Sequence, residues 1–124
     1  MKIDIMGVEL DLSYDLTDAD GAKHWEEKVA SLTEQLIAVE KKTGITQSQV
    51  IQEEISVTKK WLDQVFGAES GSKVFDGREN LKTVYVVQNL MRNLHAVYIP
   101  RILNDAWTEA LKQYSPERAQ RKKK

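Results

Sequence analysis

Apolar residues recur at helical spacing along most of this chain, and that periodicity limits the fold more than any other feature. Steps of three and four residues place such side chains on one side of a helix. The first row consists of Trp25, Val29, Leu32, Leu36 and Val39. It predicts a helix that starts near residues 17–20, where Thr17 and Asp20 resemble a capping box, and that ends before a C-cap glycine at Gly44.

A second helix is predicted from about Gln47 to Phe66, and it carries two apolar rows. Thr46 and Gln49 form a capping box at its start, and Gly67 ends it. One row is Ile51, Ile55, Thr58, Leu62 and Val65, and the other is Val50, Val57 and Trp61. A helix that is apolar over so much of its circumference touches more than one neighbour, in the same chain or in another. Core packing is the default for Trp61, but among the tryptophans it is the candidate for a protein interface.

A turn-rich segment, residues 67–79, separates the second helix from the third. Within it, Val74 and Phe75 predict a short helical turn held against the core. The glycines lack the spacing and the preceding strand of a phosphate-binding loop, so a surface loop is expected there.

The third helix is predicted to begin at Leu81, with Asn80 as its cap. Its apolar face consists of Val84, Val87, Met91, Leu94 and Tyr98. Pro100 is expected to kink or break this helix, because proline lacks an N–H and clashes with the preceding turn. The helical period continues to about Gln113.

Residues 2–14 alternate between apolar and polar, which predicts a β-hairpin that turns at Met6 and Gly7. An isolated hairpin is marginally stable, so its apolar face is expected to lie on the helices. The sequence therefore predicts a mostly α fold with a small β part (α+β). An N-terminal β-hairpin packs on a bundle of three to four helices, the last kinked at Pro100. Residues 1–114 form this single domain, and residues 115–124 form a flexible basic tail.

The residue inventory argues against catalysis and against a bound cofactor or metal. Cysteine is absent, and the two histidines, His24 and His95, fall on different predicted helices without a metal-binding spacing. The adjacent acids at 26–27 and 53–54 project in different directions and indicate solvated faces rather than an acid–base pair. No apolar run approaches the ~20 residues that cross a bilayer, so we expect a cytoplasmic protein with no membrane partner.

The last ten residues differ sharply in charge from the rest of the chain. They hold five basic side chains against one acid, for a net charge of +4, and since the whole chain carries −1, residues 1–114 carry −5. The basic residues, which are candidate partner-binding groups, are Arg118, Arg121, Lys122, Lys123 and Lys124. A solvated, disordered terminus is one interpretation, and weak binding to nucleic-acid phosphates is another. A protein partner is favoured over nucleic acid, and the acidic hairpin side chains Asp4, Glu9, Asp11 and Asp15 would suit head-to-tail self-association.

Several short motifs, in a fixed order, resemble a family of small proteins from tailed phages and prophages of low-GC Gram-positive bacteria. The motifs are Gly-Val-Glu-Leu at 7–10, Phe66-Gly67, Lys73-Val74-Phe75-x-Gly77, Asn80-Leu81 and Tyr114-Ser115-Pro116-x-Arg118-Ala119-Gln120-Arg121. The resemblance implies a non-enzymatic role in tail morphogenesis, similar to that of tail assembly chaperones, which coat the tape-measure protein before tail-tube subunits polymerise around it. It implies phage tail proteins (tape measure, tail tube) as partners and an oligomeric protein. The second helix and the basic tail are the parts we would assign to partner binding. The alternative is a small nucleic-acid-associated protein that uses its tail on phosphates.

Overall fold

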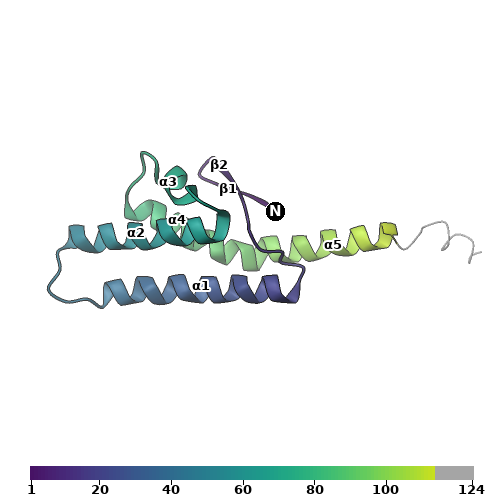
Figure 1. Cartoon of the computed structure of the whole chain (residues 1–124), viewed down its shortest axis with the longest axis horizontal. Coiled ribbons are helices and arrows are strands. Elements are labelled where there is room, and N and C mark those ends of the chain that lie inside the picture. The colour runs from purple at the N-terminus through teal and green to yellow at the C-terminus, as the bar shows by residue number, and fades with distance from the viewer. Residues whose placement is uncertain (114–124) are drawn as a thin grey trace, which may run out of the picture.

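A computed structural model describes residues 1–113, apart from the side chain of His95. Its elements follow the order β1 (Lys2–Ile5), β2 (Val8–Asp11), α1 (Ala19–Glu40), α2 (Gln47–Phe66), α3 (Ser70–Phe75), α4 (Leu81–Asn93), the π-helical segment η1 (Leu94–Tyr98) and α5 (Ile99–Gln113). In Figure 1, α1 and α2 run antiparallel, and the hairpin and α3 lie on the opposite side of α2 from α1. The bent helix formed by α4, η1 and α5 runs past α2 and the hairpin, and α5 continues beyond them. The predicted α+β fold, mostly helical with an N-terminal hairpin, is confirmed.

The two long helices begin with local capping bonds. At α2, the Thr46 backbone N–H donates to the Gln49 side chain at 2.8 Å, and the Gln49 N–H donates back to the Thr46 hydroxyl at 3.2 Å. This confirms the predicted capping box. At α1, the cap is Asp18, whose carboxylate accepts the Gly21 N–H at 3.2 Å. The helix ends at Glu40, so Gly44 is not its C-cap; it lies in the loop, where its φ of +76° suits glycine.

The hairpin is antiparallel, with Ile3 opposite Leu10. Both side chains are buried on the helices, which supplies the support that two strands need. Met6 and Gly7 both have positive φ, as the tight turn requires. The Arg78 guanidinium donates to the Met6 carbonyl at 2.8 Å, so the turn is also tied to the segment that precedes α4.

The predicted helical turn in the connection is α3, and Val74 and Phe75 are its core residues. Its start is fixed by Asp63 of α2, whose carboxylate accepts the Gly71 N–H at 2.8 Å. A Cβ on Gly71 would lie 2.4 Å from the carbonyl oxygen of Lys59. Glycine at this position therefore allows the backbone of α3 to approach α2 closely.

The last helix is bent, as predicted, and the irregular turn lies just before Pro100. The Asn80 side chain caps α4, accepting the Thr83 N–H at 3.0 Å. In η1 the Ile99 N–H donates to the Leu94 carbonyl, five residues back instead of four. This wider turn accommodates the proline ring, which would otherwise clash with the carbonyl four residues earlier. The helix therefore bends and continues, and it does not break.

Candidate protein-binding surface

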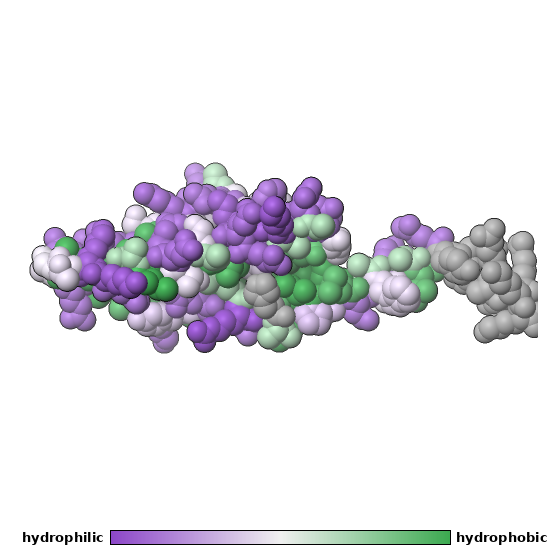
Figure 2. Space-filling model, turned by 90° about the horizontal axis from the view of Figure 1, so that it is seen from below, coloured by the Kyte–Doolittle hydropathy of each residue, from purple (hydrophilic) through white to green (hydrophobic). Residues whose placement is uncertain are grey.

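The C-terminal helix α5 has no buried residue, although its sequence is strongly amphipathic. Leu103, Trp107 and Leu111 are 53%, 66% and 50% exposed, respectively. Their spacing of four residues places them along one edge of the helix, which we call the free edge of α5. Figure 2 shows hydrophobic surface where α5 leaves the body, and again on the part that projects. Exposed apolar side chains gathered along one helix edge are typical of binding sites.

The attachment of α5 to the body is confined to its first turns. Ile99 and Ile102 pack against the core and are partly buried. From Trp107 to Gln113 every residue is exposed, so these seven residues, about 10 Å of helix, contribute no side chain to the core. In Figure 1, α5 extends beyond the ends of both α1 and α2. The free edge of α5 is therefore accessible to a partner helix over about two turns.

On the side that faces the body, α5 forms one wall of a groove of about 680 Å³, and the β2–α1 connection forms the other. Its apolar lining includes Leu12, Leu16 and Ile102. Its acidic lining, the carboxylate rim, consists of Asp15, Asp105 and Glu109. We call it the α5 groove.

The carboxylate of Asp15 is held in its charged form by its own loop. The Thr17 hydroxyl donates to it at 2.6 Å and the Thr17 backbone N–H at 2.9 Å. These two hydrogen bonds lower the pKa of Asp15 below its usual value. On the other wall, Glu109 lies 3.8 Å from Lys112, and both side chains are well exposed, so this ion pair is weak. The rim therefore remains available to a basic ligand.

Trp61 corrects the sequence-based interpretation, because it is only 2% exposed. Its indole N–H donates to the Lys28 carbonyl of α1 at 2.8 Å, and its ring lies 5.8 Å from that of Trp25. The second apolar row of α2 therefore packs on α1 of the same chain. Trp61 joins the two long helices and presents no ring to a partner.

The predicted partner-binding residues of the tail, Arg118, Arg121, Lys122, Lys123 and Lys124, lie outside the described residues. Sequence reasoning extended the helical period through α5 but did not identify its free edge as a binding surface. The signal was present, since Leu103, Trp107 and Leu111 recur at a spacing of four residues after Pro100. Identifying this row as a binding surface required the path of the bent helix, which the sequence does not give.

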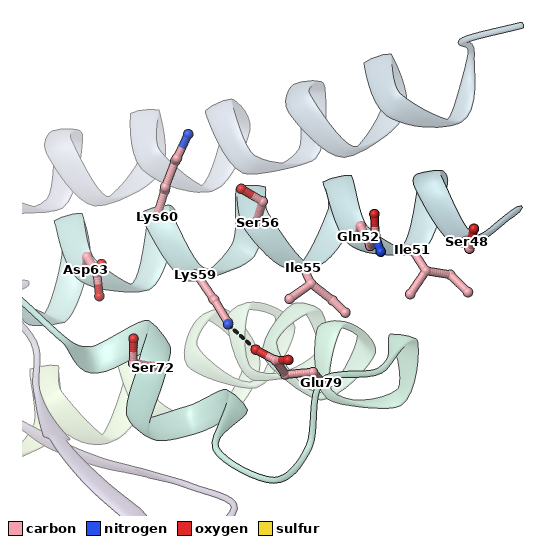
Figure 3. Close-up of a pocket in the computed structure, with 10 residues that line it drawn as sticks. All are labelled: Ser48, Ile51, Gln52, Ile55, Ser56, Lys59, Lys60, Asp63, Ser72 and Glu79. Carbon is pink, nitrogen blue, oxygen red and sulfur yellow. Dashed lines mark hydrogen bonds and ion pairs between the residues drawn. The ribbon is translucent and has the colours of Figure 1, made fainter. Parts of the chain in front are cut away.

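A second groove, of about 650 Å³, lies between α2 and the start of α4 (Figure 3). Lys59 reaches from α2 to Glu79 and forms an ion pair with it, whereas Lys60 points away from that pair. The Asp63 carboxylate is already engaged as the acceptor for Gly71. The polar contacts in this groove thus hold α3 and the start of α4 against α2.

Glu54 was expected on a solvated face, but the structure buries it between α1 and α2, at 3% exposure. Burial raises its pKa to about 7, helped by a hydrogen bond with Glu40 and by the charge of that group. A strongly shifted pKa can mark a functional site. Here the carboxyl faces the neighbouring helix rather than a cavity, so we interpret it as a structural group.

Among residues 1–113, no group of three or more side chains is placed to hold a metal ion. Within the same residues, no helix combines the length and the apolar character needed to cross a membrane.

Comparison with known proteins gives one family match. The model of a family of unknown function, DUF6673, matches residues 6–124. Neither the curated proteins nor the solved structures contain a match to the chain. Because the match spans nearly the whole chain, the protein belongs to the DUF6673 family of unknown function.

Proposed function

We propose that this protein is a non-enzymatic assembly factor that binds a helical partner through the free edge of α5. The observation that carries the proposal is the exposure of Leu103, Trp107 and Leu111 on a helix that projects from the body. An amphipathic helix with an unpaired apolar edge is suited to lie against the apolar stripe of another helix.

The partner we propose is a phage tail protein, either the tape-measure protein or a tail-tube subunit, in the cytoplasm of a bacterial host. This part rests on the motif resemblance described for the sequence. A tape-measure protein is long and helical, and its apolar stripes need cover until the tube forms around it. The exposed row on α5 has the geometry for that task, and it replaces α2 and Trp61 as the proposed contact.

The size of the free edge suits a reversible contact. Complete burial of a leucine or tryptophan side chain contributes about 1.5–3 kcal/mol, and these three side chains are already about half covered. Their burial therefore contributes about 3–4 kcal/mol in total, before the cost of association, which is too little for a tight one-to-one complex. Many copies on one long partner would bind through avidity and still be displaced one by one.

The test begins with the genes on either side of this one. If a neighbouring gene encodes a long helical protein, the two are co-expressed and co-purified. We expect a complex that Leu103→Glu and Trp107→Glu each weaken at least tenfold. Thr108→Glu is the matched control, because Thr108 is exposed on the same helix outside the apolar row.

Retention of the complex by both variants would refute the role of α5. No complex between the wild-type chain and the neighbouring tail protein would refute the tail-assembly role. The nucleic-acid alternative makes a different prediction: duplex DNA binding with a steep dependence on salt that deletion of residues 115–124 abolishes. That result, without tail-protein binding, would replace the proposal.

A further inference from the structure

The α5 groove combines an apolar lining with charge of mainly one sign. Leu12, Leu16 and Ile102 supply apolar surface, and the carboxylate rim adds three acids. Among the described residues that line the groove, the α-amino group of Met1 is the one positive charge. A net negative, partly apolar groove favours a ligand that is both basic and partly apolar.

We propose that the α5 groove binds residues 114–124 of a second copy of this chain, so that copies join head to tail. This inference goes beyond the proposed function, because it requires no tail protein. It concerns the side of α5 that faces the body, whereas the free edge lies on the outer side of the helix.

Composition matches the segment to the groove. The last ten residues have a net charge of +4, and Tyr114 immediately precedes them. An aromatic ring can cover the apolar lining while the basic groups reach the carboxylate rim. Asp105 and Glu109 are four residues apart on α5 and so point to one side of it, and Asp15 faces them from the other wall. Basic side chains spaced along a segment can therefore meet acids on both walls.

The direction of α5 favours a second copy over the chain's own tail. The helix remains regular to Gln113, past the last acid of the rim, and it leads the chain away from the body. Because Asp105 and Glu109 both precede Gln113, the tail of the same copy would have to turn back along α5 to enter this groove.

A head-to-tail contact is heterologous, since the groove and the tail are different surfaces of one copy. Each contact leaves one groove and one tail unused, so the assembly stays open and grows with concentration. If the proposed function also holds, such a row of copies would place successive free edges along one long partner.

Sedimentation velocity on the full chain tests this proposal. The groove variant combines Asp15→Asn, Asp105→Asn and Glu109→Gln, and the tail variant lacks residues 115–124. A control with Glu26→Gln, Glu27→Gln and Glu34→Gln removes three exposed acids from α1. The wild-type and control proteins should gain mass with concentration at low salt and dissociate at high salt.

The groove and tail variants should each remain monomeric. Their equimolar mixture should form dimers and nothing larger, because only one intact groove–tail pair is possible. Circular dichroism verifies folding, and the double variant Asp105→Asn/Glu109→Gln, altered only on exposed positions of α5, replaces the triple variant if that protein unfolds.

Three results would overturn the proposal. These are a wild-type protein that is monomeric at all concentrations, as docking of the tail within one chain would give; a groove variant that still associates; and a mixture that forms no dimers. None of these three results depends on a phage tail protein, so the failure of this proposal is distinguishable from the failure of the proposed function.

Discussion

Replacing Glu54 with glutamine should stabilise the protein at neutral and higher pH. The carboxyl is buried between α1 and α2, where its pKa is raised from 4.5 to about 7. Glutamine keeps nearly the same shape and hydrogen-bonding capacity, but it cannot ionise. The substitution therefore removes only the free-energy cost of burying a charge between α1 and α2.

The pKa shift sets the size and the sign of the effect. A group whose pKa is raised by folding favours the folded state below its unfolded value of 4.5, and this contribution is lost as pH rises through about 7. A shift of about 2.5 pH units at about 1.4 kcal/mol per unit gives a loss of about 3 kcal/mol by pH 8. Glu54→Gln should not suffer this loss.

Urea denaturation at a series of pH values measures the effect. Between pH 4.5 and pH 8 the wild-type chain should lose about 3 kcal/mol relative to Glu54→Gln, which is about 1–3 M in the urea midpoint. Glu34→Gln, an exposed substitution on α1, should parallel the wild type at every pH. Parallel curves for wild type and Glu54→Gln would show that the carboxyl is not desolvated, and would refute this reasoning.

Four further substitutions test the packing and the capping. Trp61→Ala should cost about 3–5 kcal/mol in unfolding free energy because it empties the α1–α2 contact, whereas Trp107→Ala should change it by less than about 0.5 kcal/mol. Equal effects of the two, measured by thermal or urea unfolding, would contradict the buried and exposed assignments. Thr46→Ala should cost about 1 kcal/mol by removing the α2 cap, and an unchanged midpoint would argue against the capping box. Gly71→Ala should destabilise by about 1–3 kcal/mol, since its Cβ meets the Lys59 backbone, and wild-type stability would mean that α3 can move away.

Features that depend on a few neighbouring residues could be predicted from the sequence. The capping box at Thr46, the cap at Asn80 and the hairpin turn are local, because their partners lie within three or four positions. The bend near Pro100 follows from the chemistry of one residue. Such features need no knowledge of where the rest of the chain lies.

Features that depend on the packing of distant segments could not be predicted as well. Trp61 and Trp107 both lie on apolar rows, and the sequence does not say which row meets another helix of the same chain. Glu54 falls within the second row of α2, three residues before Val57 and seven before Trp61, so periodicity alone places it inward. Its charge suggested exposure to solvent, but α1 packs against α2 and the side chain is buried between the two helices.

The wide turn of η1 determines which side of α5 faces the body. Beyond Leu94 a regular helix would carry the inward-facing row through charged positions, which are Arg101, Asp105 and Lys112. The five-residue hydrogen bond shifts that row by one residue, so Ile99 and Ile102 meet the core instead. Each residue corresponds to about 100° of rotation about the helix axis. Deleting one residue between 94 and 98 would therefore present a different strip of α5 to solvent without changing any residue of α5 itself.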